Sequence, residues 1–231
     1  MDSLTLPEPL KSLIKSLEAG AITNLYGGPG TGKTNICLLA CLECVRNKGK
    51  VIFIDTEGGF SLERIKQLTP DTQQLLEQVE LVEPKTFQEQ GKILRMLTER
   101  DCKLVIVDSA VALYRLEHGN DAPSTRPGKQ LLEANRELSK QMSILSNLAR
   151  EKKIPVLVTT HTFRNWDTGA NEVVGGDSVK YWSKAVVFLE HTGKTSERKA
   201  TIVKHRFLPE NRHVKFMIVE EGIKPSGFRL F

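Results

Sequence analysis

The sequence predicts an α/β fold in which a mostly parallel, twisted sheet carries helices on both faces. Short apolar runs alternate with helical patterns along the first 160 residues, and such alternation is typical of a doubly wound parallel sheet. Three β-rich runs follow at 185–191, 199–204 and 213–220, which predict an antiparallel C-terminal extension of that sheet. A glycine-rich loop between the first strand and the first long helix indicates where a ligand binds.

The individual elements follow from the spacing of apolar residues. An amphipathic helix at 9–17 is expected to end near Gly20 and to lead into the first strand. Further strands are expected at the apolar runs 50–55, 79–82, 103–108 and 154–160. Helices are expected at 33–46, 62–68, 86–99, 130–152 and 177–183. Two long loops, at 115–129 and 163–176, interrupt this alternation and indicate a binding role.

Length and composition limit the class of protein. The 231 residues fit one domain spanning 1–231, with no room for a separate N-terminal DNA-binding domain. There is no run of eighteen apolar residues and no signal-like start, so we expect a cytoplasmic protein without a membrane partner. Three cysteines, Cys37, Cys41 and Cys44, recur at helical spacing. This spacing favours core packing over disulfides, with a zinc site as the alternative.

The positive charge is concentrated near the C-terminus. The formal net charge is +5, and residues 193–231 contain nine Lys or Arg against four Asp or Glu. A basic final segment fits a phosphate-rich partner such as nucleic acid. A solvated basic face with no such partner explains the charge equally well.

The stretch Gly-Gly-Pro-Gly-Thr-Gly-Lys-Thr at 27–34 contains the P-loop pattern G-x-x-x-x-G-K-[ST]. Glycines let the backbone turn tightly and aim its N–H groups at phosphate oxygens, which the following helix N-terminus also attracts. Lysine then reaches the β- and γ-phosphates of ATP. The predicted nucleotide-binding residues here are Gly27, Gly28, Pro29, Gly30, Thr31, Gly32, Lys33, Thr34 and Asn35.

Two oxygen ligands are predicted for Mg²⁺. The Thr34 hydroxyl follows the P-loop lysine, and Asp108 ends an apolar strand just before Ser109. Ligands of parallel sheets bind at the carboxyl ends of the strands, so a carboxylate at that edge can hold the metal of a bound nucleotide.

Two further polar residues end predicted strands. Glu57 lies just beyond the strand at 50–55, where its carboxylate could orient the water that attacks the γ-phosphate; it could equally be an acid at the entry of the next helix. His161 ends the strand at 154–160, where its imidazole could touch the γ-phosphate and signal its presence to the adjoining loop. A packing role is the alternative for His161.

Five segments occur in the order found in RecA-type recombinase cores. They are 27–34, Ile-Asp-Thr-Glu-Gly-Gly-Phe-Ser-Leu-Glu-Arg at 54–64, Leu-Val-Ile-Val-Asp-Ser at 104–109, Val-Gly-Gly-Asp at 174–177 and Lys-His-Arg-Phe-Leu-Pro-Glu at 204–210. From about 10 to 223 the chain resembles the RadB family, the short archaeal paralogues of the RadA recombinase. The resemblance implies a RecA-like P-loop NTPase core.

The resemblance also implies roles for particular residues. Glu57 matches the water-activating glutamate of the family, and Arg64 matches an arginine that packs on the adenine. The loops at 115–129 and 163–176 match two DNA-facing loops, with Arg115, Arg126, Lys129, Arg164 and Trp166 as DNA-binding candidates. The segment Lys204, His205 and Arg206 matches one that reaches a neighbouring subunit's nucleotide, where Arg206 would stabilise charge on the γ-phosphate.

The function implied is that of a weak ATPase that binds single-stranded DNA and assists RadA in recombination and repair at the nucleoid. Stimulation of the ATPase by DNA and binding of double-stranded DNA are further properties compatible with the resemblance. Assembly of the chain into a homo-oligomer is compatible with this function. We expect the chain to depart from RadA-like recombinases in having no helix-hairpin-helix domain, and it has histidine, not glutamine, at 161. Two alternatives stay open: a KaiC-like signalling ATPase that acts on a protein partner without DNA, and a small-molecule P-loop kinase.

Overall fold

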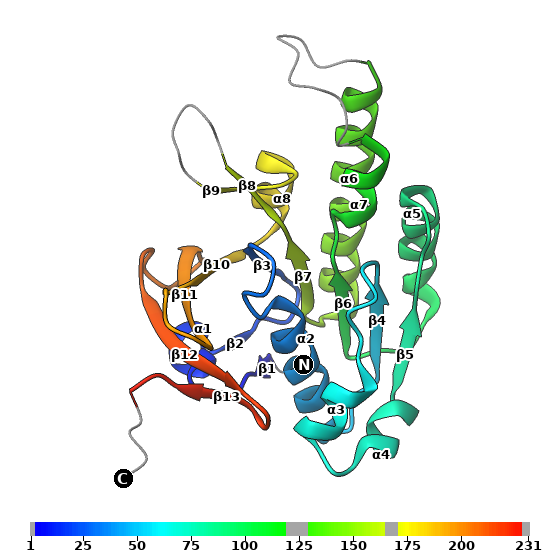
Figure 1. Cartoon of the computed structure of the whole chain (residues 1–231). Coiled ribbons are helices and arrows are strands. Elements are labelled where there is room, and N and C mark those ends of the chain that lie inside the picture. The colour runs from blue at the N-terminus through cyan, green and yellow to red at the C-terminus, as the bar shows by residue number, and fades with distance from the viewer. Residues whose placement is uncertain (1–2, 119–128, 165–170, 228–231) are drawn as a thin grey trace.

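A nine-stranded mixed sheet forms the centre of the computed structural model, which describes residues 3–118, 129–164 and 171–227 (Figure 1). The strand order is β13-β12-β11-β10-β3-β7-β6-β4-β5. The parallel strands are β3 (Ile22–Gly27), β4 (Val51–Asp55), β5 (Val79–Val82), β6 (Leu104–Asp108), β7 (Val156–Thr160) and β10 (Ala185–His191). The antiparallel strands are β11 (Glu197–Lys204), β12 (His213–Val219) and β13 (Gly222–Pro225).

The predicted α/β class and an antiparallel C-terminal extension are therefore confirmed, but the extension begins one strand later than expected. The run 185–191 forms β10, which is parallel to β3, and only β11 to β13 are antiparallel to their neighbours. In Figure 1 the antiparallel strands form one end of the sheet and β5 forms the other. Every residue of β3, β4, β6 and β7 is buried, and β4 and β6 are apolar up to their final aspartate, as expected of parallel strands covered on both faces.

Helices cover both faces of the sheet, and the alternation of side chains along the strands shows how. On β4, Phe53 packs into one core with α1 (Leu10–Ile14), α2 (Lys33–Arg46), α3 (Leu62–Leu68) and α4 (Thr72–Glu77). Its neighbour Ile54 packs into a second core with α5 (Phe87–Met96), α6 (Ala112–His118), α7 (Lys129–Lys152) and α8 (Gly176–Trp182). A 3₁₀ turn, Leu97–Glu99, follows α5. Two cores on opposite faces are what a period of two residues produces in a buried strand.

The cysteines belong to these cores. Cys37, Cys41, Cys44 and Cys102 are all buried free thiols, which confirms the packing interpretation of the three on α2. Within the described ranges no group of three or more His, Cys, Asp or Glu side chains could hold a metal ion. The same part of the chain contains no helix that is long and apolar enough to cross a bilayer.

The helix predicted at 9–17 is too long. Helix α1 ends at Ile14, because Lys15 takes a positive φ of 60° that a helix cannot continue. The chain then becomes extended, and β2 (Ser16–Leu17) pairs antiparallel with β1 (Leu4–Thr5). This small pairing buries Leu4 and Leu17 against the core. The helical spacing of apolar residues at 9–17 does not reveal that extended chain buries these two side chains.

Five further elements differ from the sequence prediction. Helix α6 extends into the loop predicted at 115–129, and the loop predicted at 163–176 contains the hairpin of β8 (Thr162–Arg164) and β9 (Asn171–Val173). Helix α4 and strand β13 lie where no element was expected. These segments are short, and tertiary contacts stabilise them: Leu75 of α4 is buried, and β13 pairs with β12.

Candidate nucleotide site at the carboxyl edge of the sheet

The predicted P-loop connects β3 to α2. Gly30 and Gly32 have φ values of 68° and 96°, a region in which glycine is favoured. Gly27 passes so close to β10 that an added Cβ would lie 2.3 Å from the Leu189 carbonyl oxygen. The Thr31 hydroxyl donates to the Gly28 carbonyl oxygen at 2.8 Å, which closes the loop on itself. The sequence therefore forms a compact loop ahead of the N-terminus of α2, as a phosphate site requires.

Lys33 is buried beneath this loop. Its Nζ donates to the carbonyl oxygens of Gly27 and Gly28 at 2.9 and 3.0 Å. Burial lowers the pKa of Lys33, while the carboxylates of Glu57 and Asp108 act in the opposite direction. A buried ammonium beside phosphate-directed amides is suited to an anionic ligand, because the anion offsets the cost of burying the charge.

Asp108 lies at the end of β6 within reach of the same loop. Its Oδ1 accepts a 2.5 Å hydrogen bond from the Thr159 hydroxyl at the end of β7, and the Thr34 hydroxyl also bonds to it. Burial raises the pKa of Asp108 above its ordinary value, despite these two hydrogen bonds. A cation beside this carboxylate would favour its charged form.

A glycine keeps space next to these oxygens. A Cβ at Gly59 would lie 3.3 Å from Thr34 Oγ1 and 3.8 Å from Asp108 Oδ2. The hydroxyl and the carboxylate thus border one small space that a side chain would fill. A hydroxyl and a carboxylate at a P-loop fit Mg²⁺, which prefers oxygen ligands and also takes phosphate oxygens and water.

The loop that carries Glu57 is organised by Asp55. Its Oδ1 accepts from the backbone N–H groups of residues 57, 58 and 59 at 2.9–3.1 Å, and its Oδ2 accepts from Phe60 at 2.8 Å. Because the carboxylate satisfies four consecutive amides, the turn after β4 has a defined shape although it is only partly buried. Sequence reasoning did not identify this role.

Thr56 ties the ends of β4 and β6 together. Its backbone N–H donates to the Asp108 carbonyl oxygen at 2.9 Å, and its Oγ1 accepts from the Ser109 N–H at 2.8 Å. The same hydroxyl donates to the Ser109 carbonyl oxygen at 2.9 Å. The segments that carry Glu57 and Asp108 are therefore held in one arrangement.

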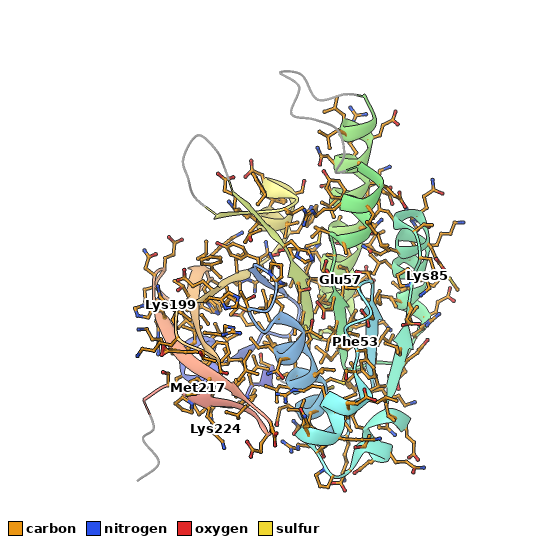
Figure 2. All side chains as sticks on the ribbon, viewed as in Figure 1. Phe53, Glu57, Lys85, Lys199, Met217 and Lys224 are labelled. Atoms are coloured by element: carbon orange, nitrogen blue, oxygen red, sulfur yellow. The ribbon has the colours of Figure 1, made fainter. Side chains whose placement is uncertain are left out.

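Glu57 and His161 are in direct contact. Glu57 Oε1 lies 2.5 Å from His161 Nε2, although 104 residues separate the two in the chain. Burial acts to raise the pKa of Glu57, but hydrogen bonds from His161 and Ser109 and the charge of Lys33 outweigh it, so the pKa is lowered. The carboxylate is thus held in its charged form, as a group that accepts a proton from water must be. Figure 2 shows Glu57 just beyond β4.

Comparison with known proteins now assigns the family. A family profile described as Rad51 matches residues 8–226. The chain belongs to the Rad51 family. Curated relatives include proteins named DNA repair and recombination protein RadB. The one from Methanobrevibacter smithii is 36% identical over 90% of this chain and 88% of its own length. The one from Methanocaldococcus jannaschii is 38% identical over 92% and 96%.

A solved structure supports the same assignment. A chain described as the crystal structure of the RadB recombinase has a TM-score of 0.79 and 30% sequence identity, and the match covers 95% of this chain and 97% of that one. The predicted resemblance to RadB and the Rad51/RecA-like fold are thereby confirmed. Members of the Rad51 family are nucleotide-binding proteins that typically use Mg²⁺, and the residues around the P-loop fit such a ligand.

Arg64 lies apart from the phosphate loop, on α3. All five of its guanidinium N–H donors have acceptors. Nε bonds to Asn35 Oδ1 on α2 at 2.8 Å, while Nη1 and Nη2 bond to Gln67 Oε1 and to three backbone carbonyl oxygens of the turn between β12 and β13. Since these bonds lie in the plane of the group, only its flat face is left for a base.

The segment Lys204, His205 and Arg206, predicted to reach a neighbouring subunit's nucleotide, lies at the opposite edge of the sheet. Strand β11 is antiparallel to β10, so its last residue, Lys204, pairs with the beginning of β10 at Val186. His205 and Arg206 lie 3.5 and 3.6 Å from the carboxylate of Glu18, which precedes β3. The six residues of β3 span roughly 20 Å. Arg206 is therefore remote from the P-loop of its own subunit.

The predicted DNA-binding residues are described only in part. Arg115 is exposed on α6, which follows β6, and the hairpin β8–β9 follows the neighbouring strand β7. Both segments therefore begin at the carboxyl edge of the sheet, which is also the edge at which the P-loop lies. Arg126 and Trp166 lie outside the described residues, as do the side chains of Lys129 and Arg164.

Several residues at the site were not identified from the sequence. Asp55 and Thr159 each end or nearly end a predicted strand, so a search of all polar strand ends would have found them. His191 and Arg198, which contact the P-loop, gave no such signal, because only the register of β10 and β11 brings them there.

The four-amide contact of Asp55 makes a stability prediction. Asp55→Asn replaces one oxygen by an NH₂ group, so at least one of the four N–H donors loses its acceptor. We expect the free energy of unfolding to fall by about 1–3 kcal/mol, the cost of a partly buried unpaired group. Urea denaturation measures the change. Asp71→Asn, at an exposed helix start without a side-chain cap bond, is the control, and an equal effect of both substitutions would contradict the role of Asp55.

Proposed function

We propose that this chain binds Mg·ATP and DNA, hydrolyses ATP slowly and assists a RadA recombinase in DNA recombination and repair. The observation that carries the proposal is the convergence of Lys33, Thr34, Asp108 and Glu57 at one edge of a Rad51-family fold. The relatives named RadB are DNA repair and recombination proteins, which supports the same role here. The residues involved come from three separate strand ends, so their convergence is a property of the fold.

The ligand chemistry follows from these residues. The backbone N–H groups of 28 and 30–33 donate to the phosphate oxygens, and Lys33 exchanges the carbonyl oxygens of Gly27 and Gly28 for phosphate. Mg²⁺, when bound, neutralises charge on the β- and γ-phosphates. Thr34 and Asp108 provide protein oxygens for the metal.

Glu57 orients the attacking water and accepts its proton, since the carboxylate is held charged beside the P-loop. In the present arrangement His161 occupies one oxygen of that carboxylate. The backbone carbonyl of His161 also accepts from Val174, just after β9. A change at Glu57 can therefore reach the hairpin β8–β9 through His161, which supports the role of His161 as a nucleotide sensor.

The flat face of Arg64 and the position of Arg206 support two finer roles. The in-plane bonds of Arg64 leave stacking on the adenine as its way of contacting the base. Arg206 lies too far from its own P-loop to act there, so it would act on the nucleotide of a second subunit, as an arginine supplied in trans.

DNA binding is the property that separates a recombination protein from an ATPase directed at a protein partner. We expect a fluorescent single-stranded oligonucleotide to bind with an affinity that falls steeply with salt and rises with Mg·ATP. Fluorescence anisotropy measures both effects. Lys33→Ala should lose the response to ATP while keeping the salt-dependent binding. No binding at low salt in either nucleotide state would reject the DNA role and favour the protein-directed ATPase.

Hydrolysis should depend on the carboxylate of Glu57. Glu57→Gln keeps the size of the side chain and its contact with His161 but removes the base. We expect retained ATP binding and a turnover reduced roughly 100-fold or more, as for loss of a general base. Phosphate release and nucleotide titration measure the two properties. Glu77→Gln, on exposed α4, is the control. A normal rate in Glu57→Gln would assign the water to another residue.

The trans role of Arg206 can be tested by mixing variants. Arg206→Ala should lower turnover only at concentrations at which the protein self-associates, because its own P-loop is intact. Mixing it with Lys33→Ala should restore part of the activity, since one subunit supplies the arginine and the other the nucleotide site. Turnover measured across a concentration series checks this. A rate that stays at the sum of the separate variants would contradict action in trans.

A further inference from the structure

Two side chains, one at the end of β10 and one near the start of β11, contact the tip of the P-loop from outside. His191 Nε2 lies 3.1 Å from the Pro29 carbonyl oxygen, and Arg198 Nε donates to the Gly30 carbonyl oxygen at 2.9 Å. A carbonyl oxygen can only accept, so His191 donates here and carries its proton on Nε2. Two consecutive carbonyls of the loop are thus bound by two donors.

These bonds fix the direction of the amides that face the phosphates. In a planar trans peptide the C=O and the following N–H point in opposite directions. The Pro29 carbonyl shares its peptide with the Gly30 N–H, and the Gly30 carbonyl shares its peptide with the Thr31 N–H. A donor that holds each carbonyl outward therefore turns the corresponding N–H inward, toward the phosphate position.

The two donors come from one place in the sheet. His191 ends β10 and Arg198 lies near the start of β11, and the two are cross-strand partners in the register. Strand β12 adds a third contact, because a Cβ at Gly32 would lie 2.9 Å from Ile218 Cδ1. His191, Arg198 and Ile218 thus lie along the outer side of the P-loop, and we refer to these three residues as the wall. Of the three, His191 and Arg198 form hydrogen bonds to the tip of the loop.

We propose that His191 and Arg198 are positioning residues that aim the Gly30 and Thr31 amides at the phosphates of the nucleotide. This inference rests on the proposed function, since it concerns the same ATP site. Neither residue is required to touch the ligand. The positive charge of Arg198 lies on the outer side of the Gly30–Thr31 peptide, whose N–H points toward the phosphate position. This charge favours binding of an anion on the inner side.

The experiment compares Mg·ATP and Mg·tripolyphosphate, measured by displacement of a fluorescent ATP analogue. His191→Leu and Arg198→Ala each remove one donor. His191→Leu should weaken both ligands by roughly two- to tenfold, the value of an ordinary hydrogen bond, and Arg198→Ala by roughly tenfold or more, because its donor is charged. The two ligands should weaken equally, because the wall acts on the phosphate chain and not on the base. Arg64→Ala should weaken Mg·ATP alone.

Two further variants separate positioning from a general structural effect. His191→Gln supplies an N–H at a similar reach and should recover most of the affinity that His191→Leu loses. Lys199→Ala is the matched control. Lys199, labelled in Figure 2, is adjacent to Arg198 on β11, but its Nζ pairs with Glu190 at 3.0 Å and not with the P-loop. It should bind both ligands like the unchanged protein. Thermal melting of each variant shows that it is folded.

The outcomes are distinct. If the unchanged protein binds neither ligand, the proposed function is rejected and the inference with it. If it binds both, and folded His191→Leu and Arg198→Ala bind them equally well, the inference alone is overturned. Failure of His191→Gln to recover affinity, or loss of Mg·ATP without loss of Mg·tripolyphosphate, also overturns it. Equal weakening of both ligands with recovery in His191→Gln supports it.

Discussion

The parallel alignment of β3, β4, β6 and β7 determines where the polar residues of this protein meet. Each of these strands is buried on both faces, so the register is strongly specified and the strands end together at one edge. The P-loop, the loop of Glu57, Asp108 and His161 follow those four ends. Asp55 and Thr56 then fix the local arrangement, one by satisfying four amides and the other by joining two strand ends.

The antiparallel strands determine which residues lie against the outer side of the P-loop and which lie at the opposite edge of the sheet. Because β11 reverses direction after β10, its two ends lie at opposite edges of the sheet. Its first residues reach the tip of the P-loop through Arg198, and the segment after its last residue carries Arg206 away to the edge near Glu18. The turn between β12 and β13 is held by Arg64. One strand reversal therefore places Arg198 against the P-loop and carries Arg206 to the opposite edge of the sheet.

The fold class was predictable because buried parallel strands carry a strong pattern, and most of their predicted bounds agree with the structure. The P-loop was predictable because glycine spacing is dictated by backbone geometry, as the positive φ values of Gly30 and Gly32 show. Short elements such as β1, β2 and α4 were missed, since they form through tertiary contacts and not through local preference. His191 and Arg198 were missed because a cross-strand register cannot be inferred from one strand's composition.

The most direct test is a crystal structure of the protein with Mg²⁺ and a non-hydrolysable ATP analogue. The nucleotide site proposed here predicts phosphates against the backbone N–H groups of 28 and 30–33, with Lys33 Nζ moved from the Gly27 and Gly28 carbonyl oxygens to the phosphate chain. It also predicts a metal beside Thr34 and Asp108. A nucleotide bound elsewhere, or a P-loop nucleotide with Lys33 still on those two carbonyls and no metal near Asp108, would contradict it.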